Sequence, residues 1–365
     1  MILICGLREA GADVIECREA GAGVGKLWQL YKKHRALRGT YDVIIVGFAG
    51  QKMALFAKLL TRKPVILDAF YSLYNTIVED RMLVSPRSLR AKWNWFLDWL
   101  SARLADLVLL DTEAHINYYI RTFGLPREKF LRVFIGADDA LFYSQDKKAN
   151  IENRISYIGE GKTEDPHMIY NRRYTQGNAP RFLVGFHGTY VPLQGAEYIV
   201  EAAKLLESDP DIRFLMIGNG QAYKKTRARA DELKTKNIQF IDSRVPQREI
   251  VCLLAPAEIC LGIFGESPKT ALVIPNKVYE YAAMKKAIIT ADTPAIRELF
   301  SKEDMELVPA ANPRAIADAI LKLRGDSKRR KELADRAHGI YTNNATPRAI
   351  GSALLAELKR RYHTV

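Results

Sequence analysis

The second half of the chain contains two neighbouring segments, Gly262-Ile-Phe-Gly-Glu-Ser-Pro-Lys269 and Ile274-Pro-Asn-Lys-Val-Tyr-Glu280-Tyr-Ala-Ala-Met284. Pro275 suits the first turn of a helix, and that helix carries Lys277 and Glu280 one turn apart near an exposed start. The carboxylate can accept hydrogen bonds from vicinal ribose hydroxyls, while the ammonium and the first helix amides can bind a diphosphate. The alternative interpretation is a surface ion pair between Lys277 and Glu280.

Runs of β-forming residues alternate with helical patterns on both sides of these segments, which predicts parallel sheets covered by helices on both faces. This pattern predicts an α/β protein with two doubly wound parallel sheets. The runs in the first half are Asp13 to Cys17, Val43 to Val46, Pro64 to Asp68 and Leu107 to Leu110. Those in the second half are Phe182 to Phe186, Arg213 to Ile217, Ile238 to Ile241, Ile259 to Phe264, Ala287 to Thr290 and Glu306 to Val308.

Two further glycine-containing turns follow predicted strands. Gly185-Phe-His-Gly-Thr-Tyr-Val-Pro-Leu-Gln-Gly195 lies between a strand and an amphipathic helix, where backbone amides can meet an anion. Ile217-Gly-Asn-Gly-Gln221 follows the next strand and allows a ligand to approach the backbone closely. Any tight strand-to-helix turn can use glycine, so neither turn identifies a ligand alone.

Length and charge restrict the kind of protein. A chain of 365 residues predicts two domains, and the formal net charge of +13 indicates an anionic partner. We find no nucleic-acid-binding motif, so a membrane surface or a phosphorylated substrate is the better explanation. The four cysteines lack the spacing of a zinc site and are expected to be buried thiols, and no metal site is predicted. Without a membrane span or signal peptide, we expect a cytoplasmic protein.

The start of the chain departs from the usual order of elements. Ile2 to Gly11 favours a helix that ends at glycine, which suggests that an opening strand is missing; a short strand at Ile2 to Cys5 is the alternative. The run Gly21-Ala-Gly-Val-Gly25-Lys26 resembles a phosphate loop, but Ala20 and Leu27 occupy the places of an essential glycine and a Ser or Thr. We therefore expect a flexible loop between a strand and a helix.

The second half resembles that of family 4 glycosyltransferases with the GT-B fold, in which a Pro-x-Lys-x-x-Glu-Tyr-x-Ala helix start binds the nucleotide. The glycine loop at 188–195, the Ile-Gly-x-Gly turn at 217–220, the helix start at 275–282 and the small-residue segment 287–294 occur in the family's order. Arg132-Val-Phe-Ile-Gly-Ala-Asp138 with Phe142 is similar to the family's crossing between lobes. The resemblance implies two Rossmann-like doubly wound domains that face a cleft.

The resemblance implies a donor site in the second lobe, with some departures from the family pattern. Thr189 and Gln194 stand where many members place an Arg and a Lys that hold the donor diphosphate, and Leu272 stands where many have a glutamate. We expect Lys269 and Lys277, with backbone amides near Gly188 and Gly265, to replace this clamp, and Glu266 to face the sugar. These two lysines and Glu266 are the predicted catalytic residues. The predicted donor-binding residues are Gly188, Thr189, Gln194, Gly218, Gly220, Asn276 and Glu280.

In the first lobe, the predicted acceptor-side residues are Asp68, Tyr71, Asp80, Arg81 and His115. Asp68 and Tyr71 leave the end of a strand, where α/β sheets place ligand groups. An N-cap explains Asp111 and Thr112 equally well, and His115 alone is more often a solvated or hydrogen-bonded residue than a catalyst.

A helix after Ser85-Pro86 is rich in basic and aromatic residues. Such a helix suits an anionic membrane surface, but its aromatic side chains could equally face the core. The residues concerned are Arg87, Arg90, Lys92, Trp93, Trp95, Phe96 and Trp99.

We expect an acceptor-binding domain at 1–145, an interdomain connection at 146–180, a nucleotide-sugar-binding domain at 181–345 and a C-terminal helix at 346–365 that packs back across the lobes. The resemblance implies a hexosyltransferase-type enzyme of bacterial surface-polysaccharide synthesis. The enzyme would transfer the sugar from a UDP- or GDP-sugar to a saccharide or lipid-linked saccharide acceptor. The transfer would retain the anomeric configuration and would need no metal or bound cofactor. The expected location is cytoplasmic, with peripheral attachment to the inner face of the plasma membrane. The alternatives are a GT-B sugar-nucleotide epimerase and a non-catalytic nucleotide-binding homologue.

Overall fold

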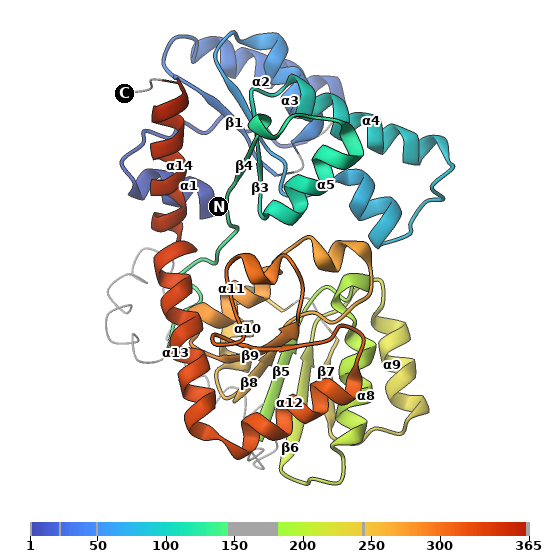
Figure 1. Cartoon of the computed structure of the whole chain (residues 1–365). Helices are drawn as coiled ribbons and strands as arrows, with labels where there is room; N and C mark the ends of the chain where they lie inside the picture. Colours follow the sequence, from blue (N-terminus) through green and yellow to red (C-terminus); the bar gives the residue numbers. More distant parts are fainter. Residues whose placement is uncertain (1, 22, 49, 145–181, 243–244, 363–365) are drawn as a thin grey trace. The chain divides into compact units, whose positions relative to one another are not determined.

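The computed structural model describes residues 2–21, 23–48, 50–144, 182–242 and 245–362, which fall into two compact units (Figure 1). Unit 1 comprises Met1–Phe134 and Pro347–Val365, and unit 2 comprises Ile135–Thr346. The expected connection at 146–180 lies outside the described residues.

Unit 1 is built on four parallel strands in the order β1-β2-β3-β4. Successive side chains of these strands point to opposite faces, and both faces are covered, which explains why the strands are almost wholly apolar. Leu67, Val108 and Leu110 pack on one face, while Ile66, Leu107 and Leu109 pack on the other. The strands are β1 (Ile44–Val46), β2 (Val65–Asp68), β3 (Leu107–Leu110) and β4 (Phe130–Arg132).

Helices from distant parts of the chain cover the two faces of this sheet. Side chains of α3, α4 and α5 join the first core, and side chains of α1 and α14 join the second. Figure 1 shows α1 next to α14. Gly6 of α1 and Gly351 of α14 allow these two helices to pack closely, since a Cβ on Gly6 would lie 2.0 Å from the Pro347 carbonyl oxygen. The elements are α1 (Ile2–Glu9), α2 (Gly23–Ala36), α3 (Gln51–Leu60), the π-helix η1 (Asn75–Asp80), α4 (Leu89–Leu104), α5 (Glu113–Phe123), the 3-10 helix η2 (Arg127–Lys129) and α14 (Pro347–Tyr362).

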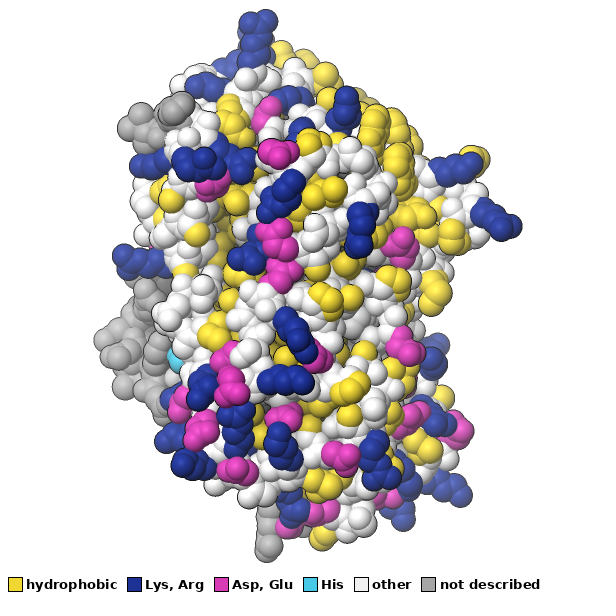
Figure 2. All heavy atoms as spheres, in the orientation of Figure 1, with side chains coloured by type: hydrophobic (Ala, Val, Ile, Leu, Met, Phe, Trp, Pro, Cys, Tyr) yellow, Lys and Arg dark blue, Asp and Glu magenta, His cyan; other side chains and the backbone are white. Residues whose placement is uncertain are grey.

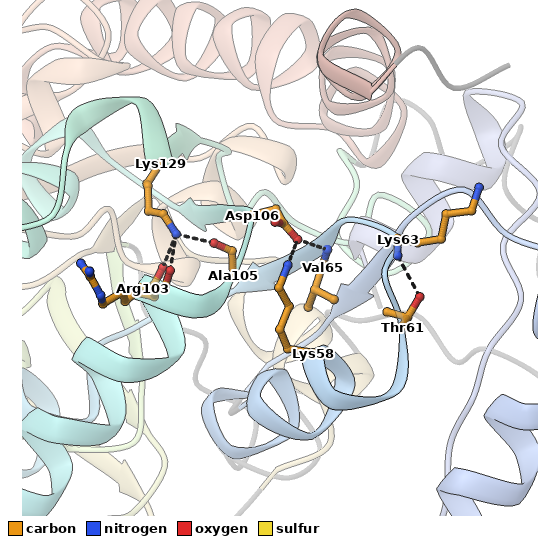
Figure 3. Close-up of polar contacts among 9 residues, drawn as sticks. Lys58, Thr61, Lys63, Val65, Arg103, Ala105, Asp106 and Lys129 are labelled. Carbon is orange, nitrogen blue, oxygen red and sulfur yellow. Dashed lines mark hydrogen bonds and ion pairs between the residues drawn. The ribbon is translucent and has the colours of Figure 1, made fainter.

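Two charged side chains fix the end of the sheet where β2 and β3 begin (Figure 3). Asp106 accepts hydrogen bonds from the Lys58 ammonium at 2.5 Å and from the Val65 amide at 2.7 Å, which joins α3 to β2. Lys129 donates to the carbonyl oxygens of Ala102, Arg103 and Ala105, the last at 2.5 Å. These carbonyls end α4, so Lys129 supplies the positive charge that a helix C-terminus favours.

Unit 2 contains six parallel strands in the order β10-β9-β8-β5-β6-β7. Read from β7, this is the Rossmann order, and the chain reverses direction across the sheet between β5 and β8. The strands are β5 (Phe182–His187), β6 (Ile212–Ile217), β7 (Ile238–Ile241), β8 (Ile259–Leu261), β9 (Ala287–Ala291) and β10 (Glu306–Val308). The helices are α8 (Ala196–Leu205), α9 (Tyr223–Glu232), α10 (Gln247–Leu254), α11 (Asn276–Ala283), α12 (Pro313–Gly325) and α13 (Ser327–Asn344), with 3-10 turns η5 (Pro192–Gln194), η6 (Pro268–Ala271) and η7 (Ile296–Glu298).

These two sheets confirm the predicted fold class, and nearly every predicted strand is present. The strand expected at Asp13 to Cys17 is wrong, because this segment is irregular and Arg8 donates to the Val14 carbonyl oxygen. The helix expected at the start is present as α1, so a strand at Ile2 to Cys5 is wrong.

Two smaller expectations also fail. The glycine run at 21–26 is not a strand-to-helix loop, because α2 already begins at Gly23 and no strand precedes it among the described residues. Cys5 and Cys17 are exposed rather than buried. Strand β4 was not predicted, because its three residues, Phe130, Leu131 and Arg132, give too short a pattern.

Candidate functional site at the strand crossover of unit 2

The carboxyl ends of β5, β6 and β8 bring three glycine-containing segments together at one edge of the sheet. Strands β5 and β8 pair directly, with Gly185 opposite Cys260, and β5 pairs with β6 on its other side. In an open parallel sheet, the crevice where the strand order reverses is the usual ligand site. The segments that follow these strands are 188–195, 218–221 and 262–275.

The segments after β5 and β8 hold each other through backbone hydrogen bonds. The Phe264 amide donates to the Gln194 carbonyl oxygen and the Gly265 amide to that of Leu193, both at 3.1 Å. Gly195 has a φ of 58°, and a Cβ there would lie 2.5 Å from the Gly265 nitrogen. The two loops therefore form one rigid wall.

Two backbone amides at this edge of the sheet already have partners. The Gly265 amide donates to the Leu193 carbonyl oxygen at 3.1 Å, and the Gly188 amide donates to the Ile217 carbonyl oxygen at 2.9 Å. A ligand at these two glycines would have to be bound by neighbouring amides or by side chains instead.

Gly218 lets the turn after β6 lie directly against the turn after β5. Its φ is 117°, and a Cβ on it would lie 2.0 Å from the Gly188 carbonyl oxygen. Gly220 is similarly close to Thr189, where a Cβ would lie 1.8 Å from the carbonyl oxygen. Glycine is thus required here by close backbone approach.

We expect Gly218→Ala to destabilise unit 2 by about 3 kcal/mol or more, because the new methyl group clashes with backbone and the φ is strained. Urea unfolding followed by circular dichroism measures this loss. Gly339→Ala is the matched control: it lies within α13 with no atom near its Cβ position, so alanine should stabilise by about 0.5 to 1 kcal/mol. Equal stability of Gly218→Ala and wild type would contradict the tight packing of the two turns.

Lys277 points its ammonium into the protein beside the first glycine loop. The residue is only 4% exposed, and its Nζ lies 3.8 Å from the centre of the Phe186 ring. Among the described residues this Nζ has no hydrogen-bond partner. Burial lowers the pKa of Lys277 to about 7, although the Glu280 carboxylate opposes the shift. A buried ammonium without an acceptor is suited to an anionic oxygen that arrives with a ligand.

Gln194 places a second polar atom without a hydrogen-bond partner beside Gly188. Its Oε1 is buried and has no hydrogen-bond partner among the described residues. A Cβ on Gly188 would lie 2.4 Å from this oxygen and 2.9 Å from the Lys277 Nζ. Both side chains therefore border the Gly188 backbone, which explains why a larger residue would not fit at 188.

Glu280 lies one turn further along α11 and faces His187, the last residue of β5. Their Nε2 and Oε2 atoms are 2.8 Å apart, which is ion-pair distance, but neither atom has hydrogen-bond geometry to a partner among the described residues. The expected exposed helix start is wrong, because Glu280 is 8% exposed and Lys277 is more buried still. The alternative of a surface ion pair between Lys277 and Glu280 fails for the same reason. Pro275 is the N-cap of α11 rather than its first residue.

The other predicted residues of unit 2 lie on the segments that follow β5 and β8. Lys269 is buried on η6, whereas Glu266 is exposed and its Oε2 accepts a hydrogen bond from the Tyr198 hydroxyl at 2.9 Å. Burial and this bond raise the pKa of Tyr198 to about 12. Thr189 and Asn276 are exposed, on the first loop and the first turn of α11.

His187 and Tyr198 were not predicted as site residues. Both are ordinary residues within a strand end and a helix, and their partners are 93 and 68 positions away. The position of His187 at the carboxyl end of a predicted strand was the only available signal. No comparable signal marked Tyr198.

In unit 1, the carboxyl ends of β2 and β3 place Asp68 near Asp111. Burial, and then the Asp111 carboxylate, raise the pKa of Asp68 to about 6. His115 is fully buried rather than solvated, and its Nδ1 lies 2.8 Å from Asp111 Oδ1. Thr112 is the N-cap of α5, since its hydroxyl accepts from the His115 amide at 3.0 Å. His115 is therefore a hydrogen-bonded residue of the core.

The other predicted acceptor-side residues surround η1. Tyr71 is half-buried before this π-helix, Asp80 is buried at its end, and Arg81 follows half-buried. The turn before η1 is held by Asp98 of α4, which accepts from the Ser72 hydroxyl at 2.7 Å and the Tyr74 amide at 2.8 Å. Sequence reasoning did not identify Asp98, whose burial raises its pKa to about 6 despite these bonds.

Unit 1 also has an open pocket away from these residues. It has a volume of about 490 Å³ and lies where β1 and β2 begin, at the opposite edge of the sheet from Asp68. Its lining includes Arg38, Tyr41, Lys58 and Lys63. Ligands of parallel sheets bind at the carboxyl ends of the strands, so we do not place the acceptor here.

The described residues contain no group of three or more His, Cys, Asp or Glu side chains placed to hold a metal ion. In the same part of the chain, no helix is long and apolar enough to cross a bilayer.

The second unit matches a known family in sequence. Residues 181–326 match the family model described as "Glycosyl transferases group 1". The match covers less than half of the whole chain and lies within unit 2. The three glycine segments, Lys277 and Glu280 all lie within the matched residues. No curated protein sequence matches the chain.

Solved structures resemble nearly the whole chain in fold. Anabaena Alr3699/HepE in complex with UDP has a TM-score of 0.67 and 17% identity, over 91% of this chain and 82% of that one. Sucrose-phosphate synthase from Thermosynechococcus elongatus has a TM-score of 0.65 and 14% identity, over 92% and 78% of the two chains. A glycosyltransferase from Rickettsia africae has a TM-score of 0.64 and 13% identity, over 95% and 84%. The fold of this chain is GT-B.

Proposed function

We propose that this chain is a glycosyltransferase that moves a hexose from a nucleotide sugar to a saccharide or lipid-linked saccharide acceptor. The observation that carries the proposal is the buried Lys277 ammonium, which has no hydrogen-bond partner among the described residues. It lies within the residues that match the group 1 family model, beside the loop after β5. A nucleoside diphosphate would supply the missing anionic oxygen.

The neighbouring residues fit the other parts of such a donor. Glu280 is placed one turn beyond Lys277, where its carboxylate can accept from ribose hydroxyls. Lys269 and Lys277 would stabilise the negative charge that develops on the departing diphosphate, because a fixed ammonium needs no reorganisation during the reaction. Glu266 and its partner Tyr198 lie on the exposed side and would contact the sugar.

UDP-sugars are the first donors to test, and GDP-sugars the second. The solved structures similar in fold include Anabaena Alr3699/HepE in complex with UDP-glucose, at 16% identity. Retention of configuration, metal independence, membership of family 4 and an acceptor of a surface polysaccharide are parts of the proposal that rest on the sequence resemblance. Asp68, Tyr71, Asp80, Arg81 and His115 remain the proposed acceptor side, with His115 acting through Asp111 rather than by direct contact.

The test is binding and turnover of nucleotide sugars by the full chain. A saturating nucleotide at about 100 times its Kd adds about 2.7 kcal/mol of stability, so we expect the melting temperature to rise by several degrees. Release of nucleoside diphosphate should then depend on an added lipid-linked or free saccharide acceptor. Conversion of the sugar nucleotide to its epimer without acceptor would indicate an epimerase instead. Binding without turnover would indicate a non-catalytic homologue, and absence of nucleotide binding would overturn the donor site.

A further inference from the structure

Helix α4 leaves part of its apolar surface uncovered. It buries the polar side chains of Asn94, Asp98 and Ser101 together with Leu97, and other large apolar side chains stay outside. A globular helix normally buries its large apolar side chains. The large side chains of α4 at positions 89, 93 and 96 share one face and point outward.

The outward face is apolar to an unusual degree. Leu89 is 85% exposed, Trp93 is 51% exposed, and the Phe96 ring lies 5.8 Å from that of Trp93. The loop before α4 adds Met82, which is 73% exposed, and Leu83. Single exposed apolar residues are common, but Leu89, Trp93 and Phe96 follow one another at helical spacing on one face, and a group of this kind indicates an interaction site.

The two sequence interpretations of this helix therefore apply to different residues. Trp95 and Trp99 pack against the core of unit 1, and the Trp95 ring lies 5.5 Å from that of Phe123. Trp93 and Phe96 remain exposed and add nothing to that core. Core packing explains only the first pair.

The charged side chains closest in sequence to the apolar face are basic. Residues 82–97 contain Arg87, Arg90 and Lys92, all exposed, and no Asp or Glu. The acidic residues next to this range, Asp80 and Asp98, are buried. Figure 2 shows dark-blue and yellow spheres together over α4, at the right of unit 1. This segment therefore combines exposed aromatic side chains with uncompensated positive charge.

The excess charge of the whole protein is concentrated in the same unit. Unit 1 contains 24 Lys and Arg against 14 Asp and Glu, a formal net charge of +10. Unit 2 contains 31 against 28, a net charge of +3. An anionic partner is therefore attracted mainly to unit 1.

We propose that α4 and residues 82–88 form the surface by which unit 1 binds an anionic lipid bilayer. Leu89 and Trp93 enter the membrane interface, and Arg87 and Arg90 contact lipid phosphates. Amphipathic helices with Trp, Phe and Leu on one face and basic flanks bind such surfaces. A second copy of this chain is the poorer occupant, since it would bring like charges together. The proposal deepens the proposed function, because it rests on a lipid-linked acceptor reaching the enzyme from the membrane.

The test is co-sedimentation of the full chain with vesicles of phosphatidylcholine alone or mixed equally with phosphatidylglycerol, without donor or acceptor. We expect binding to the anionic vesicles, weakened by salt. The double variants Leu89→Ser/Trp93→Ser and Arg87→Glu/Arg90→Glu should each reduce it about tenfold or more. Matched controls on exposed sites of unit 2, Leu205→Ser/Leu321→Ser and Arg314→Glu/Lys328→Glu, should bind as wild type.

Tryptophan fluorescence provides a second measurement. Anionic vesicles should shift the wild-type emission to shorter wavelength, and Trp93→Phe should remove this shift while Trp28→Phe, another exposed tryptophan, should keep it. Failure of wild type to bind anionic vesicles at low salt, or undiminished binding by both α4 double variants, would overturn the proposal. Nucleotide binding by the same variants is measured separately, so a failed membrane surface is distinguished from a failed donor site.

Discussion

Lys277→Met is expected to lower the affinity for a nucleoside diphosphate by about 100-fold and yet to leave the protein as stable as wild type or more stable. The lost affinity reflects a charge-assisted contact of about 3 kcal/mol made inside the protein. The stability follows because methionine removes a buried charge that has no hydrogen-bond partner among the described residues. Titration calorimetry with UDP or GDP and urea unfolding measure the two effects.

Lys286→Met is the matched control for a buried lysine. Its ammonium donates to the carbonyl oxygens of Ala255 and Ala257, at 2.5 and 3.0 Å, at the edge of the sheet where β9 begins. Removing the Lys286 ammonium should destabilise unit 2 and leave nucleotide affinity unchanged. Lys277→Met should do the opposite, because it should lower affinity without lowering stability. Equal behaviour of the two variants would rule out a special role for Lys277.

The pH dependence of Lys277 gives an independent check of this prediction. Its folded-state pKa of about 7 lies below the ordinary value of 10.5, so between these values the unfolded chain binds more protons than the folded one. The contribution of Lys277 to stability therefore rises with pH across this window and is most unfavourable below pH 7. A bound diphosphate favours the ammonium, so binding above pH 7 should take up a proton and weaken by up to tenfold per pH unit.

Calorimetry in buffers of different ionisation enthalpy counts the protons taken up on binding. We expect an uptake that approaches one proton near pH 9 in wild type and disappears in Lys277→Met. An unchanged proton uptake in the variant would assign the linkage to another group.

Glu280→Gln is expected to weaken nucleoside diphosphate binding by about 30- to 100-fold, because the amide keeps the shape of the side chain but loses the charge that strengthens hydrogen bonds from ribose hydroxyls. The decisive measurement is a thermodynamic cycle with ribo- and 2′,3′-dideoxynucleoside diphosphates. If the carboxylate contacts the hydroxyls, removing either partner should cost about as much as removing both. Additive losses would show that Glu280 acts elsewhere, for example by orienting His187.

Glu201→Gln is the control for a carboxylate away from the candidate site. Glu201 lies on α8 and pairs with Arg229 at 2.8 Å, and both side chains are half-buried. A solvent-accessible ion pair contributes little, so both stability and affinity should stay near wild type. Loss of affinity in this variant would indicate a general effect of charge rather than a contact.

Local patterns predicted most of the fold. Strands such as Leu107–Leu110, Ile238–Ile241 and Glu306–Val308 were predicted to the residue, because runs of apolar or β-branched residues bounded by turns need no tertiary information. The segment at 13–17 has a similar composition but forms no strand, because a strand also needs a neighbour to pair with. Strand β4 shows the opposite case: its three residues have no strand pattern in the sequence, but they form a strand because they pair with β3.

The candidate site was predicted as a set of segments but not as an arrangement. Each glycine turn follows a strand in the sequence, and parallel strands place their carboxyl ends together, so the meeting of the turns after β5, β6 and β8 could be expected. The backbone bonds that occupy the Gly188 and Gly265 amides could not, because they link residues 29 and 72 positions apart.

The sequence by itself determined the two parallel sheets, the positions of the glycine turns and the presence of Lys277 and Glu280 on one helix, because these depend on residue type and spacing along the chain. Only the tertiary structure decided that Lys277 is buried over Phe186, that Glu280 faces His187, and that α4 buries Asp98 while Trp93 points outward. Burial and pairing depend on which distant segments pack against a residue. The pattern along the chain gives a helix its faces, but the neighbours in space determine which face is covered.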